Sequence, residues 1–413
     1  MSSKQLFAPP EIPSKYDVIP IHASDISAFM TCRRRWDWTS PSRNNLRRRV
    51  ELYGVNPNLW FGTGIHYALE RFYSPLLKRD PVEVFSTWFA MQWEGGFIPV
   101  GEDENLQLEQ SYDLDPIATD SGWEVRGLRD LLPSPDEDEW LGYRDMGIGM
   151  MEFYKDYAAR EDDFEVIAAE SNFSVPLDFE AVDIRTNSPN FGEKLEVHLR
   201  GKRDAILYYP DRKDPRTQFG IHDYKTASHI DENYFLKLEN DPQCTTYIVA
   251  SCKEAEQHDL PWTTIQDVLY TALKKGYPKP PTMTTRGFPS VNRAEETTTA
   301  QMFVDCVKNE GLIDWFHNDI KAQGYYEWLL EEGDKVFIQR DRAVRNPHQI
   351  KVAYDELVMV AKEMVDPDVN IYKHPSGSFT CTKCAFRAPC LSKDDGSDWE
   401  EMLVQGFEIN RDR

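Results

Sequence analysis

Two apolar runs in the middle of the chain, 201–209 and 221–228, limit its fold more than any other feature. The first run reads GKRDAILYY and the second reads IHDYKTAS, and a polar segment with two prolines separates them. Two strands joined by a loop would bring Asp204, near the start of the first run, close to Asp223 in the second. The sequence therefore predicts a strand pair that carries two carboxylates at one place.

Carboxylates that converge repel each other, so such a site is stable mainly when a cation neutralises it. Hard oxygen ligands favour Mg²⁺ or Mn²⁺. Lys225 is two positions after Asp223, so both side chains point to the same side of the sheet, where the ammonium could hold a phosphate or an attacking water. An ordinary hairpin with a surface Asp and Lys explains these residues equally well.

The charge balance restricts how the chain could bind nucleic acid. Its 413 residues carry 47 basic and 70 acidic side chains, a net charge of -23, which is the wrong sign for binding DNA by bulk charge. Any DNA contact must be local. Two basic stretches are the candidates: one contains Arg33 and Arg34, and the other is 47–49. A solvated charged face is the alternative for each stretch.

Length and composition favour one elaborated α/β domain over 21–400, preceded by an N-terminal arm at 1–20 and followed by a tail at 401–413. No apolar run approaches the roughly 20 residues of a membrane span. The N-terminal residues also lack the apolar core of a secretion signal. We therefore expect a soluble protein of the cytoplasm.

Two helices are expected before residue 95. The segment 24–38 reads as a short helix that begins at Ser24, with Cys32 near its end. The segment 59–77 has apolar residues every three or four positions, which predicts an amphipathic helix. His66 and Glu70 share one face of that helix, although a single helical histidine is more often structural than a ligand.

The rest of the chain alternates expected strands and helices. Glu170 lies in a strand-like run, 164–175, where a solvent-facing glutamate is the ordinary alternative. Gln243 and Tyr247 lie one turn apart on an expected helix and could bond and stack on a nucleotide. Two segments, 95–140 and 255–345, read as insertions, the first as a mobile loop. Further elements are expected as helices at 140–160, 297–331 and 347–365 and strands at 264–276 and 335–340.

Three cysteines fall within ten residues, at Cys381, Cys384 and Cys390. Disulfides are uncommon inside cells, so this spacing indicates a metal, either zinc or an iron-sulfur cluster. A fourth ligand is needed, and Cys32, at the other end of the chain beside a basic helix, is the candidate. Such a site would tie the segment 378–392 to the N-terminal region.

Taken together, these motifs resemble the RecB-like branch of the PD-(D/E)XK nuclease superfamily, in particular its iron-sulfur members such as CRISPR-associated exonucleases and recombinational-repair nucleases. The resemblance rests, in order, on Cys32, FGTGIHYALERFY, GKRDAIL, HDYKTAS followed by QCTTY, and CTKCAFRAPC. It does not cover 95–140 or 255–345. The pair Asp-x-Lys also departs from the Glu-x-Lys of many relatives, which could alter metal preference.

The resemblance implies a role for each matched residue. The implied ligands of a divalent ion are His66, Asp204, Asp223 and the carbonyl of Tyr224, with Glu170 as a further candidate. Lys225 would orient the attacking water or stabilise developing charge. Gln243 and Tyr247 would lie against the substrate strand, together with basic groups such as Arg33 and Arg34. The implied ligands of a structural 4Fe-4S cluster are Cys32, Cys381, Cys384 and Cys390.

The function implied by the resemblance is a Mg²⁺- or Mn²⁺-dependent deoxyribonuclease, an exonuclease acting on single-stranded DNA or DNA ends. A non-catalytic DNA-binding or assembly subunit of a repair or recombination complex is the alternative, and a zinc-stapled protein of unrelated activity is a third reading. The chain has no G-x4-G-K-[ST] motif and so no helicase motor of its own, which leaves a helicase or recombination protein as a partner and fits a phage nuclease.

Overall fold

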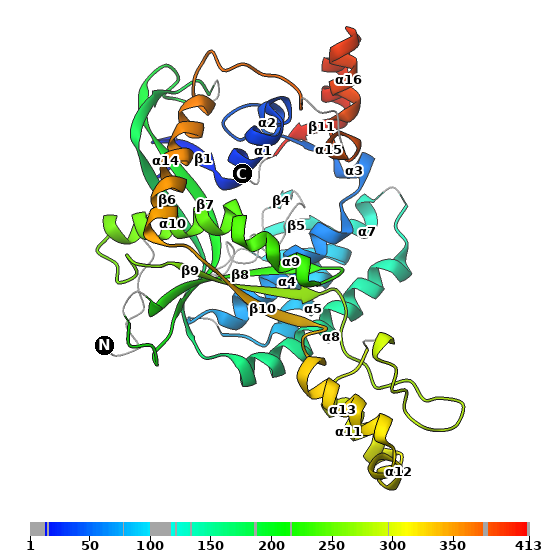
Figure 1. The fold of residues 1–413 in the computed structure, drawn as a ribbon. Coiled ribbons are helices and arrows are strands. Elements are labelled where there is room, and N and C mark those ends of the chain that lie inside the picture. The colour runs from blue at the N-terminus through cyan, green and yellow to red at the C-terminus, as the bar shows by residue number, and fades with distance from the viewer. Residues whose placement is uncertain are drawn as a thin grey trace.

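A mixed six-stranded sheet lies at the centre of the protein (Figure 1). The structure, a computed structural model, describes residues 13–410 except 15, 77, 100–116, 120–121, 133, 186–187, 215–216, 296 and 375–378. One edge of the long strand β7 pairs with β6, and its other edge is shared by β1 and β8, after which β9 and β10 continue the sheet. The strands are β1 (Ile19–His22), β6 (Glu165–Val182), β7 (Lys194–Tyr208), β8 (Phe219–Ala227), β9 (Asp267–Lys274) and β10 (Ile338–Val344).

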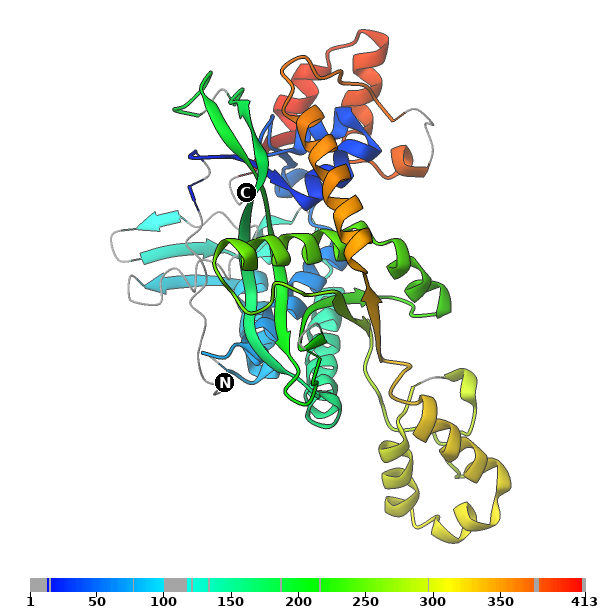
Figure 2. The ribbon, with the colours of Figure 1, turned by 60° about the vertical axis from the view of Figure 1, so that its left-hand side comes forward.

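Helices cover both faces of this sheet, and the α/β architecture expected from the sequence is confirmed (Figure 2). On one face, α10 (Pro242–Gln257) and α14 (Pro347–Met364) pack with α1 (Ala23–Thr31) in a core that contains Val197, Ile221 and Ile248. On the other face, α4 (Pro57–Tyr73), α5 (Pro81–Glu94) and α8 (Glu137–Glu161) form a second core, rich in aromatic residues. The short helices α3 (Val50–Tyr53) and α9 (Glu232–Leu236) and the 3-10 turns η2 (Lys237–Asn240) and η3 (Arg293–Glu295) complete the connections.

Two expected helices differ in extent from the prediction. The segment 24–38 forms two helices, α1 (Ala23–Thr31) and α2 (Arg33–Thr39), because Cys32 between them has an extended backbone, with φ -158° and ψ 106°. The helix at 59–77 is α4, which starts earlier, at Pro57 after an Asn56 cap, and ends at Tyr73. Leu76, expected on its apolar face, is 72% exposed.

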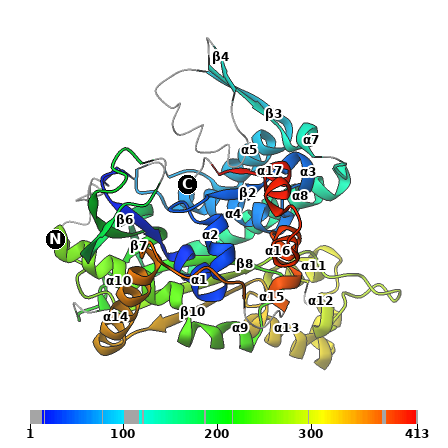
Figure 3. The same cartoon turned by 90° about the horizontal axis from the view of Figure 1, so that it is seen from above.

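Neither proposed insertion is a plain loop. The first, 95–140, contains a three-stranded sheet that stands away from the body (Figure 3) and a short helix before α8, which corrects the expectation of a mobile loop over its described part. Its elements are β3 (Gly95–Pro99), β4 (Ile117–Thr119), β5 (Gly122–Arg126) and α7 (Leu128–Leu131). The strands escaped prediction because three to five residues are too few to show a clear alternation.

The second proposed insertion, 255–345, supplies β9 and β10 of the central sheet and a helical projection (Figure 2). The single helix expected at 297–331 is three helices, α11 (Ala300–Asn309), α12 (Ile313–Asn318) and α13 (Ile320–Glu332). Gly311, with φ +68°, separates α11 from α12, and Asp319 caps the start of α13. The projection has its own small core around Phe303 and Tyr325.

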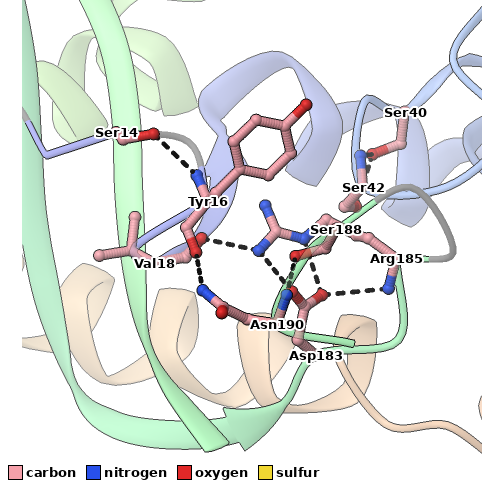
Figure 4. Close-up of polar contacts among 9 residues, drawn as sticks. All are labelled: Ser14, Tyr16, Val18, Ser40, Ser42, Asp183, Arg185, Ser188 and Asn190. Carbon is pink, nitrogen blue, oxygen red and sulfur yellow. Dashed lines mark hydrogen bonds and ion pairs between the residues drawn. The ribbon is translucent and has the colours of Figure 1, made fainter. Parts of the chain in front are cut away.

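The N-terminal arm is shorter than expected, because β1 begins at Ile19 and pairs with β7. A buried ion pair between Asp183 and Arg185 anchors the chain just before β1 (Figure 4). There Arg185 donates to the carbonyl of Val18 over 3.0 Å, and Asn190 donates to the carbonyl of Tyr16 over 2.9 Å. Residues 1–12 of the arm lie outside the described part of the chain.

The C-terminal segment packs against the N-terminal region, which corrects the expected tail at 401–413. After α15 (Phe379–Thr382) and α16 (Arg387–Asp395), α17 (Trp399–Gly406) leads into β11 (Phe407–Ile409), which pairs with β2 (Leu46–Arg48). The buried rings of Trp38, Phe386 and Phe407 form a small core between the two ends. Within the described residues, no helix has the length and hydropathy needed to span a membrane.

Candidate active site

The predicted strand pair around Asp204 and Asp223 is confirmed. β7 and β8 are antiparallel, and Ala205 pairs with His222, so the next residues in register, Asp204 and Asp223, lie on neighbouring strands. Asp204 Oδ2 accepts a hydrogen bond of 2.7 Å from the backbone N–H of Tyr224. The pairing of the two strands thus fixes one oxygen of Asp204 and leaves the other for further partners.

Glu170 completes a group of three potential ligands with His66 and Asp204. One ligand atom from each lies within 4.8 Å of the others. His66 comes from α4, and its Nδ1 is 3.4 Å from Asp204 Oδ1. The flanking pairs, Ala169 with Ala205 and Ser171 with Arg203, place Glu170 opposite Asp204 on the neighbouring strand.

The backbone at Glu170 is strained. Its φ is +47°, in the left-handed region that non-glycine residues rarely adopt. Two carboxylates opposite each other on paired strands also repel, although Lys202 forms an ion pair with Glu170. A strained residue that brings like charges together is typical of a functional site.

Asp223 and Lys225 lie beside this group on β8. Lys225 Nζ donates to Asp223 Oδ1 over 2.9 Å, which confirms that the two side chains share one side of the strand. The other oxygen, Asp223 Oδ2, is buried and has no hydrogen-bond partner among the residues that the structure describes. A buried carboxylate oxygen without a partner is costly, and a bound cation would satisfy it.

The carboxylates of the site have strongly shifted pKa values. Burial and the charge of Asp204 raise the pKa of Glu170 to about 7, and burial raises the pKa of Asp223 to about 6 despite Lys225. Burial also acts to raise the pKa of Asp204, but the neighbouring His66 and Lys225 outweigh it and hold that pKa below its usual range. Not all three groups can be charged at low cost without a cation.

Nearby carboxylates raise the pKa values of the two basic groups of the site, Lys225 and His66. Burial acts to lower the pKa of Lys225. The charges of Asp223 and Asp204 raise that pKa by more than burial lowers it, so the ammonium stays protonated. Burial likewise opposes protonation of His66, and the charge of Asp204 reverses the effect and raises its pKa. Lys225 is therefore suited to donate to a negative oxygen and unsuited to act as a base.

His66, Glu170, Asp204 and Lys225 line a cleft of about 480 Å³, whereas Asp223 is buried. Two lysines that sequence reasoning missed, Lys202 and Lys275, line it together with Lys225. Lys275 directly follows β9 and is held by Asn58, whose Oδ1 accepts from its Nζ over 2.7 Å. No local pattern marked Lys275, because its position depends on the parallel pairing of β8 and β9, which brings the residues after both strands to one edge of the sheet.

Gln243 and Tyr247 lie beside this cleft. Gln243 Nε2 donates to Tyr247 Oη over 2.7 Å, as their one-turn spacing allows. They line a second cavity of about 790 Å³ between α1 and α10, and Lys202 lines both cavities. Glu70, which shares a helix face with His66, lines the first cleft and pairs with Arg71 at 3.2 Å.

Arg33 and Arg34, expected to contact DNA, have partners within the chain instead. Arg33 pairs with Glu363 at 2.5 Å, and Arg34 pairs with Asp394 at 2.7 Å; both arginine side chains are 14% exposed. The second basic stretch, 47–49, also bonds to the C-terminal region. These arginines join the two ends of the chain, so we do not assign them to DNA. Sequence alone could not reveal these partners, because they lie more than 300 positions away.

The four cysteines Cys32, Cys381, Cys384 and Cys390 line one cavity of about 420 Å³. They are more widely spaced than the ligands of the carboxylate site, which is the only close group of potential metal ligands among the described residues. Arg34 Nη1 donates to the sulfur and to the carbonyl of Cys390, each over 3.2 Å. The break between α1 and α2 at Cys32 allows the N-terminal thiol to face the C-terminal three.

Buried carboxylates, an imidazole and a lysine thus meet on three neighbouring strands and α4, in a group that could hold a divalent ion. The chain belongs to the PD-(D/E)XK nuclease superfamily, whose sequence pattern it matches over residues 21–391. Its mixed sheet flanked by helices fits that fold, and members of the superfamily are typically metal-dependent nucleases. No curated protein matches the chain.

Proposed function

We propose that the protein is a Mg²⁺- or Mn²⁺-dependent deoxyribonuclease that acts as an exonuclease on single-stranded DNA or DNA ends. The observation that carries the proposal is the convergence of His66, Glu170 and Asp204 within 4.8 Å. Beside them lies a buried oxygen of Asp223 to which no described residue donates. Oxygen and imidazole ligands suit these ions. Membership of the nuclease superfamily supports the reaction type.

The residues of the site would divide the chemistry among them. His66, Glu170, Asp204 and Asp223 would hold the ion. When bound, the ion lowers the pKa of a water and neutralises charge on the phosphate. Lys225, held by Asp223 and fully protonated, donates to a phosphate oxygen as negative charge develops there. Lys202 and Lys275 line the same cleft and hold the neighbouring phosphates.

The second cavity supports a single strand as substrate. Gln243 and Tyr247 line it beside Lys202, and amide and hydroxyl groups hold unpaired bases by hydrogen bonding, although the ring of Tyr247 is itself buried. The narrow, local character of this surface is consistent with the net charge of -23, because binding does not depend on bulk charge. A helicase or recombination protein as partner, and the cytoplasm as location, stay predictions.

We further propose that Cys32, Cys381, Cys384 and Cys390 hold a structural 4Fe-4S cluster. Supporting it are four thiols around one cavity and the packing of α2 against the C-terminal helices. Zinc would use the same four thiols. Anaerobic purification followed by metal analysis decides between them: iron and sulfide with absorbance near roughly 400 nm support the cluster, and stoichiometric zinc contradicts it.

A cleavage assay tests the proposed activity directly. Single- and double-stranded DNA, blocked at the 5′ or the 3′ end, would be incubated with Mg²⁺, Mn²⁺ or EDTA. We expect metal-dependent degradation of single strands, blocked by one of the two end modifications. Binding of DNA without cleavage in either metal would instead support a non-catalytic subunit.

Replacement of Lys275 by alanine is expected to raise KM about tenfold with a smaller change in kcat. The lysine lines the cleft without contacting the carboxylate group, so it contributes to phosphate binding in ground and transition state alike. Steady-state kinetics on a single-stranded oligonucleotide measures the effect. Lys351, an exposed lysine on α14, provides the matched control. A loss confined to kcat would contradict this role.

Glu170→Gln is expected to stabilise the metal-free protein while weakening Mn²⁺ binding. The amide removes the repulsion from Asp204 and the cost of burying a charge, worth on the order of 1 kcal/mol. The same change removes a charged ligand. Thermal melting with and without Mn²⁺ measures both effects, and Glu165→Gln on the exposed start of β6 is the control. An unchanged Mn²⁺-induced shift would exclude Glu170 from the site.

A further inference from the structure

A fully buried ion pair lies behind the carboxylate site, between Arg203 on β7 and Glu254 on α10. Their side chains are 2% and 3% exposed. Arginine and glutamate are almost never buried to this degree unless they are paired. Since neither can reach the cleft, neither can be a catalytic residue.

The guanidinium of Arg203 joins three elements of the fold. It forms the ion pair with Glu254, donates from Nε to Ser171 Oγ on β6 over 2.8 Å, and donates from Nη1 to Ser251 Oγ on α10 over 3.1 Å. It also lies over the ring of Phe173 at 5.6 Å. One side chain thereby fixes β6, β7 and α10 relative to one another.

The residues that this pair fixes are direct neighbours of the site. Arg203 immediately precedes Asp204, and its partner Ser171 immediately follows Glu170. Because side chains alternate along a strand, Arg203 and Ser171 hold the face opposite to the two carboxylates. The strained backbone at Glu170, with φ +47°, is thus anchored one residue away by a hydrogen bond.

On α10 the same pair also fixes the position of Tyr247 and Gln243, which line the second cavity. Tyr247, Ser251 and Glu254 are spaced by four and three residues and so share one face of the helix. The ring of Tyr247 packs edge-on against Phe173 at 6.3 Å. Any shift of Glu254 along β7 would therefore also move Tyr247 and its partner Gln243 relative to the carboxylates.

Stability alone does not account for this pair. Burying two charges is costly, and well-packed apolar residues of similar volume are often as stable or more stable. What an apolar contact does not supply is the directional geometry of a guanidinium with three fixed acceptors.

We propose that Arg203 and Glu254 are positioning residues that set the distance between the ligand group of Glu170 and Asp204 and the substrate-binding turn at Gln243 and Tyr247. This inference rests on the proposed function of that site. The pair acts through the backbone of β6 and β7 and through the helix axis of α10.

The test is the double variant Arg203→Met with Glu254→Met, which removes both charges without leaving either one unpaired. We expect a folded protein with an unchanged or higher melting temperature. Its Mn²⁺ affinity by calorimetry should fall about tenfold or more, as is typical when groups that orient ligands are lost. Its kcat on single-stranded DNA should fall as well. Wild-type Mn²⁺ affinity in the folded double variant overturns the inference.

A second variant keeps the test decisive if the double variant does not fold. Glu254→Asp retains both charges and shortens the acceptor by one methylene, so it changes geometry alone. It too should weaken Mn²⁺ binding, and unchanged affinity overturns the inference.

The buried pair Asp183 and Arg185, which anchors the segment before β1, is the matched control (Figure 4). Replacing both of these with methionine should leave the affinity of the folded protein for Mn²⁺ unchanged. Weakened Mn²⁺ binding in this control as well would show a general effect of losing a buried pair and overturn the specific role. A wild-type protein that binds no Mn²⁺ would refute the proposed function itself, and the inference with it.

Discussion

Asp204→Asn is expected to reduce Mg²⁺- or Mn²⁺-dependent cleavage by about 10³-fold or more, the largest effect of any single substitution in the site. Asp204 lies centrally, because it contacts His66, faces Glu170 across the strand pair and is fixed by the N–H of Tyr224. The amide keeps the shape and the hydrogen bond to Tyr224 while removing the negative charge. Single-turnover cleavage of a labelled oligonucleotide measures the loss.

The matched control is Asp211→Asn, in the exposed turn between the same two strands. It changes the net charge equally and should leave cleavage unaltered. Full activity of Asp204→Asn with either metal would refute the proposed mechanism. Loss of activity together with loss of Mn²⁺ binding would locate the defect in the ion site, and retained Mn²⁺ binding would argue for a role in the chemical step.

Cys381→Ser is expected to remove iron and to lower the melting temperature by roughly 5 °C or more, while the chemical step at the carboxylate site changes little. The four cysteines would link residues 349 positions apart. Closing a loop of this length restricts the unfolded chain by about 6 kcal/mol in the chain-entropy description of cross-links. Iron analysis, thermal melting and single-turnover cleavage at saturating DNA measure the three quantities.

Cys306→Ser on the helical projection is the control for this substitution, because Cys306 lies outside the cysteine cavity. It should change neither iron content nor melting temperature. Unchanged thermal stability of Cys381→Ser after iron is lost would show that the site does not staple the two ends. A chemical step slowed as strongly as in Asp204→Asn would show that the cluster acts on the reaction itself.

Local pattern was sufficient for the central strand pair and for α4. The alternation of GKRDAIL and HDYKTAS defines which side chains share a face, and a short connection makes the two strands neighbours. For that reason the closeness of Asp204 to Asp223 and of Lys225 to Asp223 could be predicted from the amino-acid sequence alone. His66 could be placed on a helix by the apolar spacing around it, although the partner of that helix could not.

The position of Glu170 in the site could not be predicted from the local sequence pattern. Its strand was expected, but the alternation of the run gave no reason to prefer the site over solvent. Its place opposite Asp204 depends on the register of β6 against β7 and on a left-handed backbone at that one residue. Both are consequences of long-range pairing, including the anchoring of Ser171 by Arg203.

The partners of the basic stretches could not be predicted from the sequence either. Clusters of arginine near the N-terminus suggested an external surface for DNA, yet Arg33 and Arg34 pair with Glu363 and Asp394. A long cationic side chain has no local preference for solvent, a phosphate or a carboxylate elsewhere in the chain, so its partner depends on the folded arrangement. The supposed tail at 401–413 was misjudged for the same reason, since β11 exists only by pairing with β2.

By itself, the sequence determined the class of chemistry: a pair of strands with Asp204, Asp223 and Lys225, a helical His66, and four cysteines split between the ends of the chain. Those features follow from periodicity and spacing over short distances. Only the tertiary structure decided that Glu170 lies with His66 and Asp204, that Lys202 and Lys275 line the cleft, and that the buried Arg203–Glu254 pair connects β7 to α10. These depend on contacts between segments far apart in the chain, which strand register and burial fix and which no local pattern encodes.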